Sequence, residues 1–152
     1  MRITALLMCI SLCTTAEASP ILTKPDRLSF SISSNHIGAV VQYNERNPGV
    51  FVTWEHPHHD INVGAYKNSF SKLSVLSTVS LQMYKTEDFS FEVFVGGAYY
   101  PEDGRTFALH VGDFIPLGGL QVRYKNIFSQ IIPMNSPNAK AILTFGVSFS
   151  LK

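Results

Sequence analysis

Apolar and small polar residues alternate over long stretches of this chain. Near the C-terminus, one parity consists of Leu143, Phe145, Val147, Phe149 and Leu151. The opposite parity consists of Thr144, Gly146, Ser148 and Ser150. A period of two places successive side chains on opposite faces of a β-strand, and no segment after residue 18 has the apolar spacing of a helix over three turns. The alternation therefore predicts that the body of the chain is nearly all strand.

Turn residues and breaks in the alternation divide this body into eight predicted strands. They cover residues 28–34, 50–55, 61–66, 72–84, 89–99, 106–114, 120–126 and 141–151. No internal repeat, low-complexity tract or linker separates them, so we expect the 152 residues to hold a single domain. The predicted fold class is all-β, an eight-stranded antiparallel barrel.

The distribution of charge indicates which face of such a barrel is apolar. Charged residues make up 15% of the chain and apolar residues 45%, whereas charged residues are about 25% of an average soluble domain. The polar parity of residues 73–84 and 143–151 holds Ser, Thr, Gln and Gly, not the charges that cover a soluble barrel. Small neutral side chains suit a narrow interior and apolar stripes suit lipid. We therefore predict a transmembrane β-barrel, with Glu92 and Arg123 as a polar pair inside it.

The first residues have the features of a secretory signal peptide. Arg2 precedes an apolar stretch at residues 5–12, and Ala16-Glu17-Ala18 is an A-x-A cleavage site. This stretch is too short for a membrane-spanning helix, which needs about 20 apolar residues. We predict that residues 1–18 are removed and that residues 19–152 form one outer-membrane barrel domain. Both cysteines lie in the removed part, so we expect no disulfide in the mature protein.

Outer-membrane barrels have short periplasmic turns and longer external loops. With both termini on the periplasmic side, the predicted external connections are residues 35–49, 67–71, 100–105 and 127–140, and the internal ones are 56–60, 85–88 and 115–119. His36 then lies in the first external loop and Ser69 in the second. Neighbouring loops share one rim, where a serine nucleophile and a histidine base can meet.

Two short motifs resemble a known family. They are Tyr43-Asn44-Glu45-Arg46 followed by Pro48-Gly49, and Tyr66-Lys67-Asn68-Ser69-Phe70-Ser71-Lys72, with a later Ile132-Pro133. These motifs are similar to those of the outer-membrane lipid A palmitoyltransferases. The resemblance implies an eight-stranded barrel that takes a palmitoyl chain from a phospholipid into its interior and transfers it to lipid A. It also implies a catalytic site of His36, Ser69 and Asn68.

The chain departs from that family at one of these three residues. Asn68 stands where the family has an aspartate, and an amide can neither accept a proton nor stabilise an imidazolium as a carboxylate does. The first external loop is also shorter than in the family. Little chain precedes the first strand to form the family's N-terminal amphipathic helix.

The leading hypothesis is transfer or hydrolysis of phospholipid or lipid A acyl chains at the external leaflet of a bacterial outer membrane. His36 is the base at Ser69 in this hypothesis, and Glu45 is a candidate to orient the imidazole. One alternative is a non-catalytic outer-membrane barrel for adhesion, surface protection or membrane integrity. A periplasmic lipid-binding barrel is a third interpretation.

Other partners are not predicted. A net charge of +1 gives no basic surface for nucleic acid, so the expected partners are membrane lipids and the expected state is a monomer. His56, His58, His59 and Asp60 have ligand chemistry for Zn²⁺ or Cu²⁺, but Pro57 divides them and the spacing fits no known metal motif. No cofactor or metal is expected.

Overall fold

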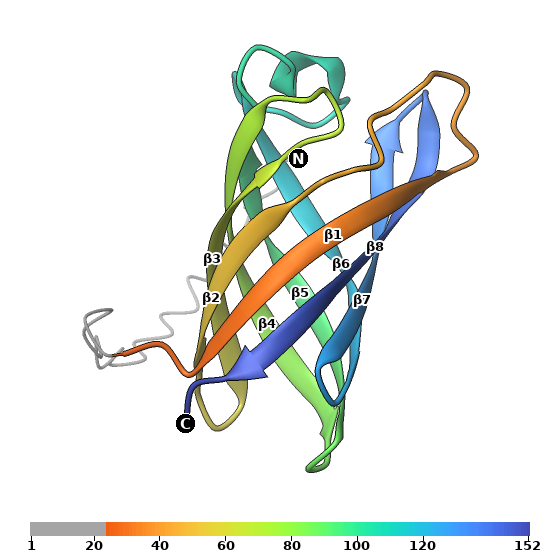
Figure 1. The fold of residues 1–152 in the computed structure, drawn as a ribbon. Helices are drawn as coiled ribbons and strands as arrows, with labels where there is room; N and C mark the ends of the chain where they lie inside the picture. Colours follow the sequence, from red (N-terminus) through yellow and green to blue (C-terminus); the bar gives the residue numbers. More distant parts are fainter. Residues whose placement is uncertain (1–23) are drawn as a thin grey trace, which may run out of the picture.

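The computed structural model describes residues 24–152, which form a closed antiparallel barrel of eight strands in chain order (Figure 1). The strands are β1 (Arg27–Ile37), β2 (Gly49–Glu55), β3 (His59–Lys67), β4 (Leu73–Lys85), β5 (Phe89–Tyr99), β6 (Phe114–Tyr124), β7 (Ile127–Ser136) and β8 (Ala139–Ser150). A short 3-10 helix, η1 (Gly104–Thr106), lies between β5 and β6. The predicted all-β, eight-stranded antiparallel barrel is confirmed. The predicted signal peptide lies outside the described residues.

The longer connections gather at one end of the barrel, which we call the loop end (Figure 1). It carries residues 38–48, 68–72, 100–113 and 137–138, while the opposite turn end carries 56–58, 86–88 and 125–126. Within residues 24–152, no helix has the length and apolar character needed to cross a membrane.

The predicted strand at 106–114 is wrong. Its apolar residues suggested a wall strand, but residues 100–113 form a connection that is closed by the bond from the Tyr100 amide to the Asp113 carbonyl, 2.8 Å. Phe107 packs against the rings of Tyr100 and Phe70 instead, at centroid distances of 5.2 and 6.4 Å. Phe107 thus packs among aromatic rings at the loop end and does not belong to a paired strand of the wall.

The predicted connections at 115–119 and 127–140 are also wrong. Gly118-Gly119 suggested a turn but lies inside β6, which includes the predicted strand 120–126 as far as Tyr124. A Cβ on Gly119 would lie 2.3 Å from the carbonyl oxygen of Ile131, so close packing against β7 explains that glycine. The true turn is residues 125–126, and β7 occupies most of the expected fourth external loop.

The two faces of the wall have the polarity that alternation predicts. On β4, the side chains of Ser74, Thr78 and Ser80 are buried in the interior, at 6% exposure or less. Their neighbours Leu73, Val75, Val79 and Leu81 are between 41 and 70% exposed on the outside. On β8, Ser148 is buried while Phe145 and Phe149 are exposed. On these two strands the outer face is thus apolar, and the inner face carries buried polar side chains.

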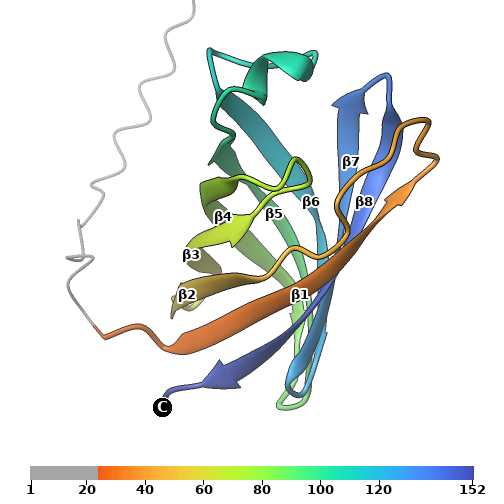
Figure 2. The same cartoon turned by 45° about the horizontal axis from the view of Figure 1, so that its top comes forward.

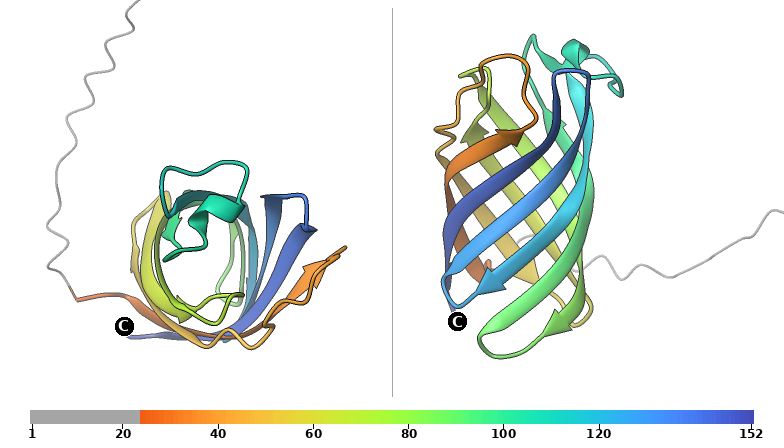
Figure 3. Two further views of the ribbon diagram at one scale, coloured as in Figure 1. Left: turned by 90° about the horizontal axis from the view of Figure 1, so that it is seen from above. Right: turned by 90° about the vertical axis from the view of Figure 1, so that its right-hand side faces the viewer.

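The wall is incompletely paired near the loop end. Pairing between β6 and β7 ends at Leu120 and Ile131, although both strands continue beyond these residues. Pairing between β1 and β2 ends at Ser31 and Gly49, and the rest of β1 pairs with β8 alone. Figure 2 shows β7, β8 and the end of β1 leaning away from β6 together, and Figure 3 shows the same splay from above.

Candidate functional site

The structure brings His36 and Ser69 together at the loop end. The Nε2 atom of His36 lies 2.8 Å from the Oγ atom of Ser69, although 33 positions separate them in sequence. His36 is near the end of β1 and 6% exposed, and Ser69 belongs to the connection between β3 and β4. A neutral imidazole nitrogen at this distance can accept the hydroxyl proton, as a general base does.

Asn68 shapes the turn that presents Ser69. Its side chain is 0% exposed, and its Oδ1 atom accepts the backbone N–H groups of Phe70 and Lys72 at 2.9 and 3.0 Å. Its Nδ2 atom donates to Ser74 Oγ at 2.9 Å. Asn68 therefore ties the connection to the start of β4, and its amide bonds to these groups rather than to His36.

Tyr43 holds the imidazole from the other side. Its ring stacks on that of His36 with centroids 4.2 Å apart and planes inclined by 18°. The edge of the same ring contacts Phe70, at a centroid distance of 5.9 Å. The backbone N–H of Asn44 donates to the carbonyl of Ser69 at 3.0 Å. The first connection is thereby fastened onto the second, which fixes both halves of the His36–Ser69 contact.

Glu45 contacts the main chain of His36. Its Oε1 atom accepts the backbone N–H of His36 and the Nδ2 amide of Asn35, both at 3.3 Å. The Nδ1 atom of His36 is buried and, within residues 24–152, has no hydrogen-bond partner. The imidazole is therefore bonded at one nitrogen only.

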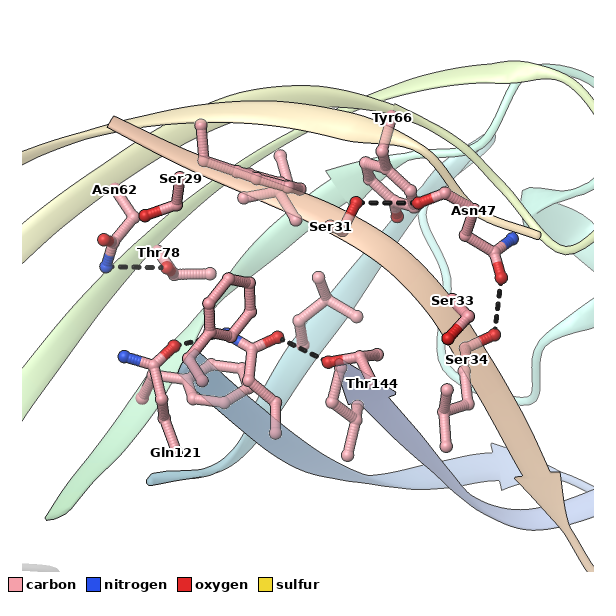
Figure 4. Close-up of a pocket in the computed structure, with 18 of the residues that line it drawn as sticks. Ser29, Ser31, Ser33, Ser34, Asn47, Asn62, Tyr66, Thr78, Gln121 and Thr144 are labelled. Carbon is pink, nitrogen blue, oxygen red and sulfur yellow. Dashed lines mark hydrogen bonds between the residues drawn. The ribbon is translucent and has the colours of Figure 1, made fainter. Parts of the chain in front are cut away.

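A cavity of ≈110 Å³ lies inside the barrel (Figure 4), and Ser69 is one of the residues that line it. Its apolar wall consists of Phe51, Tyr66, Leu76, Phe94, Tyr100, Leu117, Phe128, Ile132 and Ile142. Its polar wall includes Ser29, Ser31, Ser34, Asn47, Thr53, Asn62, Thr78, Gln121, Arg123, Gln130 and Thr144. Ser69 also lines an open pocket at the loop end together with Tyr43, Arg46 and Lys72. Ser69 thus lies between the outside and the interior.

A hydrogen-bonded polar tier runs along the inner face of the neighbouring strands β5, β6, β7 and β8 at one level of the sheet. Gln130 bonds Gln121 at 2.7 Å and Thr144 at 3.2 Å, and Gln121 donates to Glu92 at 2.9 Å. Glu92 also forms an ion pair with Arg123, 3.2 Å, and both side chains are buried. The predicted polar pair inside the barrel is confirmed. We call Glu92, Gln121, Arg123, Gln130 and Thr144 the polar tier.

The histidine-rich turn has a different character. The rings of His56 and His59 stack with centroids 4.7 Å apart, and Asp60 accepts a bond from Gln82 at 2.8 Å. Across the described part of the chain, no group of three or more His, Cys, Asp or Glu side chains could hold a metal ion.

No protein-family model and no curated protein matches this sequence. The resemblance to the lipid A palmitoyltransferases therefore stays a prediction from the short motifs quoted above.

Proposed function

We propose that this protein is an outer-membrane barrel in which His36 and Ser69 transfer or hydrolyse acyl chains of phospholipid or lipid A at the external leaflet. The observation that carries the proposal is the 2.8 Å contact between His36 Nε2 and Ser69 Oγ at the mouth of an interior cavity. A serine hydroxyl that is hydrogen-bonded to a base can attack an ester, and the partly apolar cavity beside it suits the hydrocarbon tail of that ester.

In the proposed reaction, Ser69 is the nucleophile and His36 is the base. Ser69 Oγ bonds to the ester carbonyl carbon while its proton passes to His36 Nε2, and His36 then gives that proton to the departing lipid alkoxide. An acyl-serine remains. A hydroxyl of lipid A, or water, attacks it as His36 takes the incoming proton and returns it to Ser69. Transfer and hydrolysis differ only in this acceptor.

The exterior of the barrel supports the membrane part of the proposal. Side chains such as Val79, Val95, Leu120 and Phe145 lie outside at 39% exposure or more, which is the surface that lipid covers. The strands β4 and β5 contain 13 and 11 residues, and a tilted strand needs about 9–11 to cross the hydrocarbon layer.

The incomplete β6–β7 pairing supports a lateral route for the acyl chain. Pro116 and Pro133 lie beyond the last pair, Leu120 and Ile131, and proline has no N–H with which to bond a neighbouring strand. Ile132, also beyond that pair, lines the interior cavity. A chain that enters between these strands from the outer leaflet would reach the cavity below Ser69.

Mass spectrometry of lipid A tests the proposal. Cells that make the wild-type protein are expected to show lipid A with one acyl chain added or removed, and cells that make His36→Ala or Ser69→Ala are expected to lack that change. Ser150→Ala, at the turn end, is the matched control and should behave as wild type.

Two results would overturn the proposal. Identical acylation of lipid A and phospholipid with the wild-type and His36→Ala proteins would leave the non-catalytic barrel as the better explanation. Extraction of the mature protein without detergent, with no heat-dependent change in gel mobility, would favour the periplasmic lipid-binding barrel.

A further inference from the structure

The imidazole of His36 has a buried nitrogen without a partner. When Ser69 donates its hydroxyl hydrogen to Nε2, a neutral imidazole carries its own hydrogen on Nδ1. That Nδ1 atom is buried and has no acceptor within residues 24–152. A buried donor is unfavourable until an acceptor reaches it. The Nδ1–H group of His36 therefore needs a hydrogen-bond acceptor, and this arrangement of side chains does not provide one.

Asn68 is not available for this role. Its oxygen accepts the N–H groups of Phe70 and Lys72, and its nitrogen donates to Ser74. Turning the amide toward the imidazole would break all three bonds. The turn that presents Ser69 would then be held by its backbone bonds alone, from Asn68 to Lys72 and from Ser71 to Asn68.

Glu45 is the carboxylate that contacts the backbone of His36. Its carboxylate already lies 3.3 Å from the backbone nitrogen of that residue. This distance is slightly longer than the usual range for N–H···O bonds, so the bond is a weak one. The Glu45 carbonyl accepts the Ser34 N–H at 2.9 Å and keeps residue 45 beside β1. Nδ1 belongs to the same residue as that nitrogen, so the carboxylate already lies beside the residue whose Nδ1 lacks an acceptor.

We propose that Glu45 is the positioning residue of the site and that its carboxylate accepts the Nδ1–H of His36. This inference rests on the proposed acyl transfer, since orienting the imidazole matters only if His36 acts as a base. Glu45 holds the ring with Nε2 toward Ser69 and stabilises the imidazolium that forms when Ser69 loses its proton. The orienting carboxylate thus belongs to Glu45 in the connection between β1 and β2. Asn68 only stabilises the turn that carries Ser69.

The variant Glu45→Gln separates this role from a structural one. Glutamine keeps an acceptor oxygen for the His36 and Asn35 N–H groups but loses the negative charge. Glu102→Gln is the matched control, because Glu102 is a carboxylate of the loop end that pairs with Lys72, 2.8 Å, and not with His36. Full-length protein in detergent micelles is used for each variant.

Two measurements decide the question. In NMR of ¹⁵N-histidine-labelled protein, the Nδ1–H signal that disappears in His36→Gln is expected to lie downfield in wild type and in Glu102→Gln, and to move upfield in Glu45→Gln. The rate at which a fluorophosphonate probe labels Ser69 is expected to fall at least about tenfold in Glu45→Gln alone.

The outcomes separate the two proposals. An unchanged Nδ1–H signal and an unchanged labelling rate in Glu45→Gln overturn the role of Glu45. So does a faster labelling rate in Asn68→Asp, which would assign the missing carboxylate to position 68. A signal that depends on Glu45, in a wild-type protein whose Ser69 is never labelled, supports the positioning contact and contradicts acyl transfer.

Discussion

Gly118 and Gly119 are adjacent in β6, but only at position 119 would a side chain clash with its surroundings. A Cβ on Gly119 would lie 2.3 Å from the Ile131 carbonyl oxygen and 2.9 Å from the ring of Phe94. At Gly118 the nearest atom would be 3.5 Å away, which is ordinary contact. Gly119, which faces the interior, therefore has no room for a methyl group. Gly118, which faces outward, has room for one.

This difference gives a paired prediction for single substitutions. Gly119→Ala is expected to destabilise the barrel by about 1–3 kcal/mol, because the backbone of β6 or β7 has to shift. Gly118→Ala is expected to change the stability by no more than about 0.5 kcal/mol. Unfolding by urea in detergent micelles measures both, and equal effects would contradict the packing described here.

At the same scale, the sequence was a partial guide to the site. His36 and Ser69 were predicted to share a rim because strand order places their connections side by side. The motif resemblance at 66–72 implied Asn68 as a site residue, and the hypothesis for His36 and Ser69 included Glu45 as a candidate to orient the imidazole. The bonds of Asn68 were not predictable, since they depend on how the backbone folds between Phe70 and Ser74, and alternation carries no information about a connection.

Among the elements, β5 and β6 are joined inside the barrel by the buried pair of Glu92 and Arg123. Glu92 also accepts hydrogen bonds from Ser90 at 2.7 Å and from Gln121 at 2.9 Å. Its carboxylate is therefore well satisfied, whereas Arg123 depends on it for charge balance. A buried guanidinium without its partner is strongly unfavourable.

This pair predicts a non-additive response. Glu92→Met is expected to destabilise the barrel by about 3–5 kcal/mol, because it leaves Arg123 charged and buried. The double variant Glu92→Met with Arg123→Met is expected to recover most of that loss. A double-mutant cycle by urea unfolding measures the coupling, and a double variant as unstable as the sum of the two single ones would contradict it.

The strands that alternate cleanly were predicted within a few residues, and the others were not. In β4 and β8 most of the inward side chains are short and neutral, so the alternation is easy to recognise. In β6 and β7 the residues Pro116, Gly118, Gly119 and Pro133 interrupt it. These residues usually mark turns, but here they lie where the two strands approach closely or stop pairing. Only the positions of the neighbouring strands show whether such a proline or glycine marks a turn or lies inside a strand.

For the whole molecule, the central property is the reversal of polarity between the two faces. Val79 is the middle residue of β4 and is 41% exposed on the outside. Leu73 lies on the same face at the loop end and is 70% exposed. If the barrel spans a bilayer, these two positions lie at different depths.

The depth difference predicts the effect of a single charge. Val79→Lys is expected to destabilise the barrel in phospholipid vesicles by about 2–4 kcal/mol, whereas Leu73→Lys should cost about 0–1 kcal/mol. Folding into vesicles, followed by the heat-dependent gel shift at increasing urea, measures both. Equal stability of Val79→Lys and wild type would contradict a membrane-spanning wall.

The incomplete pairing of the wall divides the loop end into two leaves. One leaf consists of the free ends of β7, β8 and β1, which lean outward together (Figure 2). His36 lies on this leaf, and Ser69 belongs to the rest of the barrel. The contact between His36 and Ser69 thus also joins the two leaves, together with the bonds from Ser34 to Glu45 and Asn47. In the proposed acyl transfer, a lipid that entered by spreading the leaves would separate His36 from Ser69, and the contact would form again only after the lipid had passed. Entry of the lipid and reaction at Ser69 would then occur at different times.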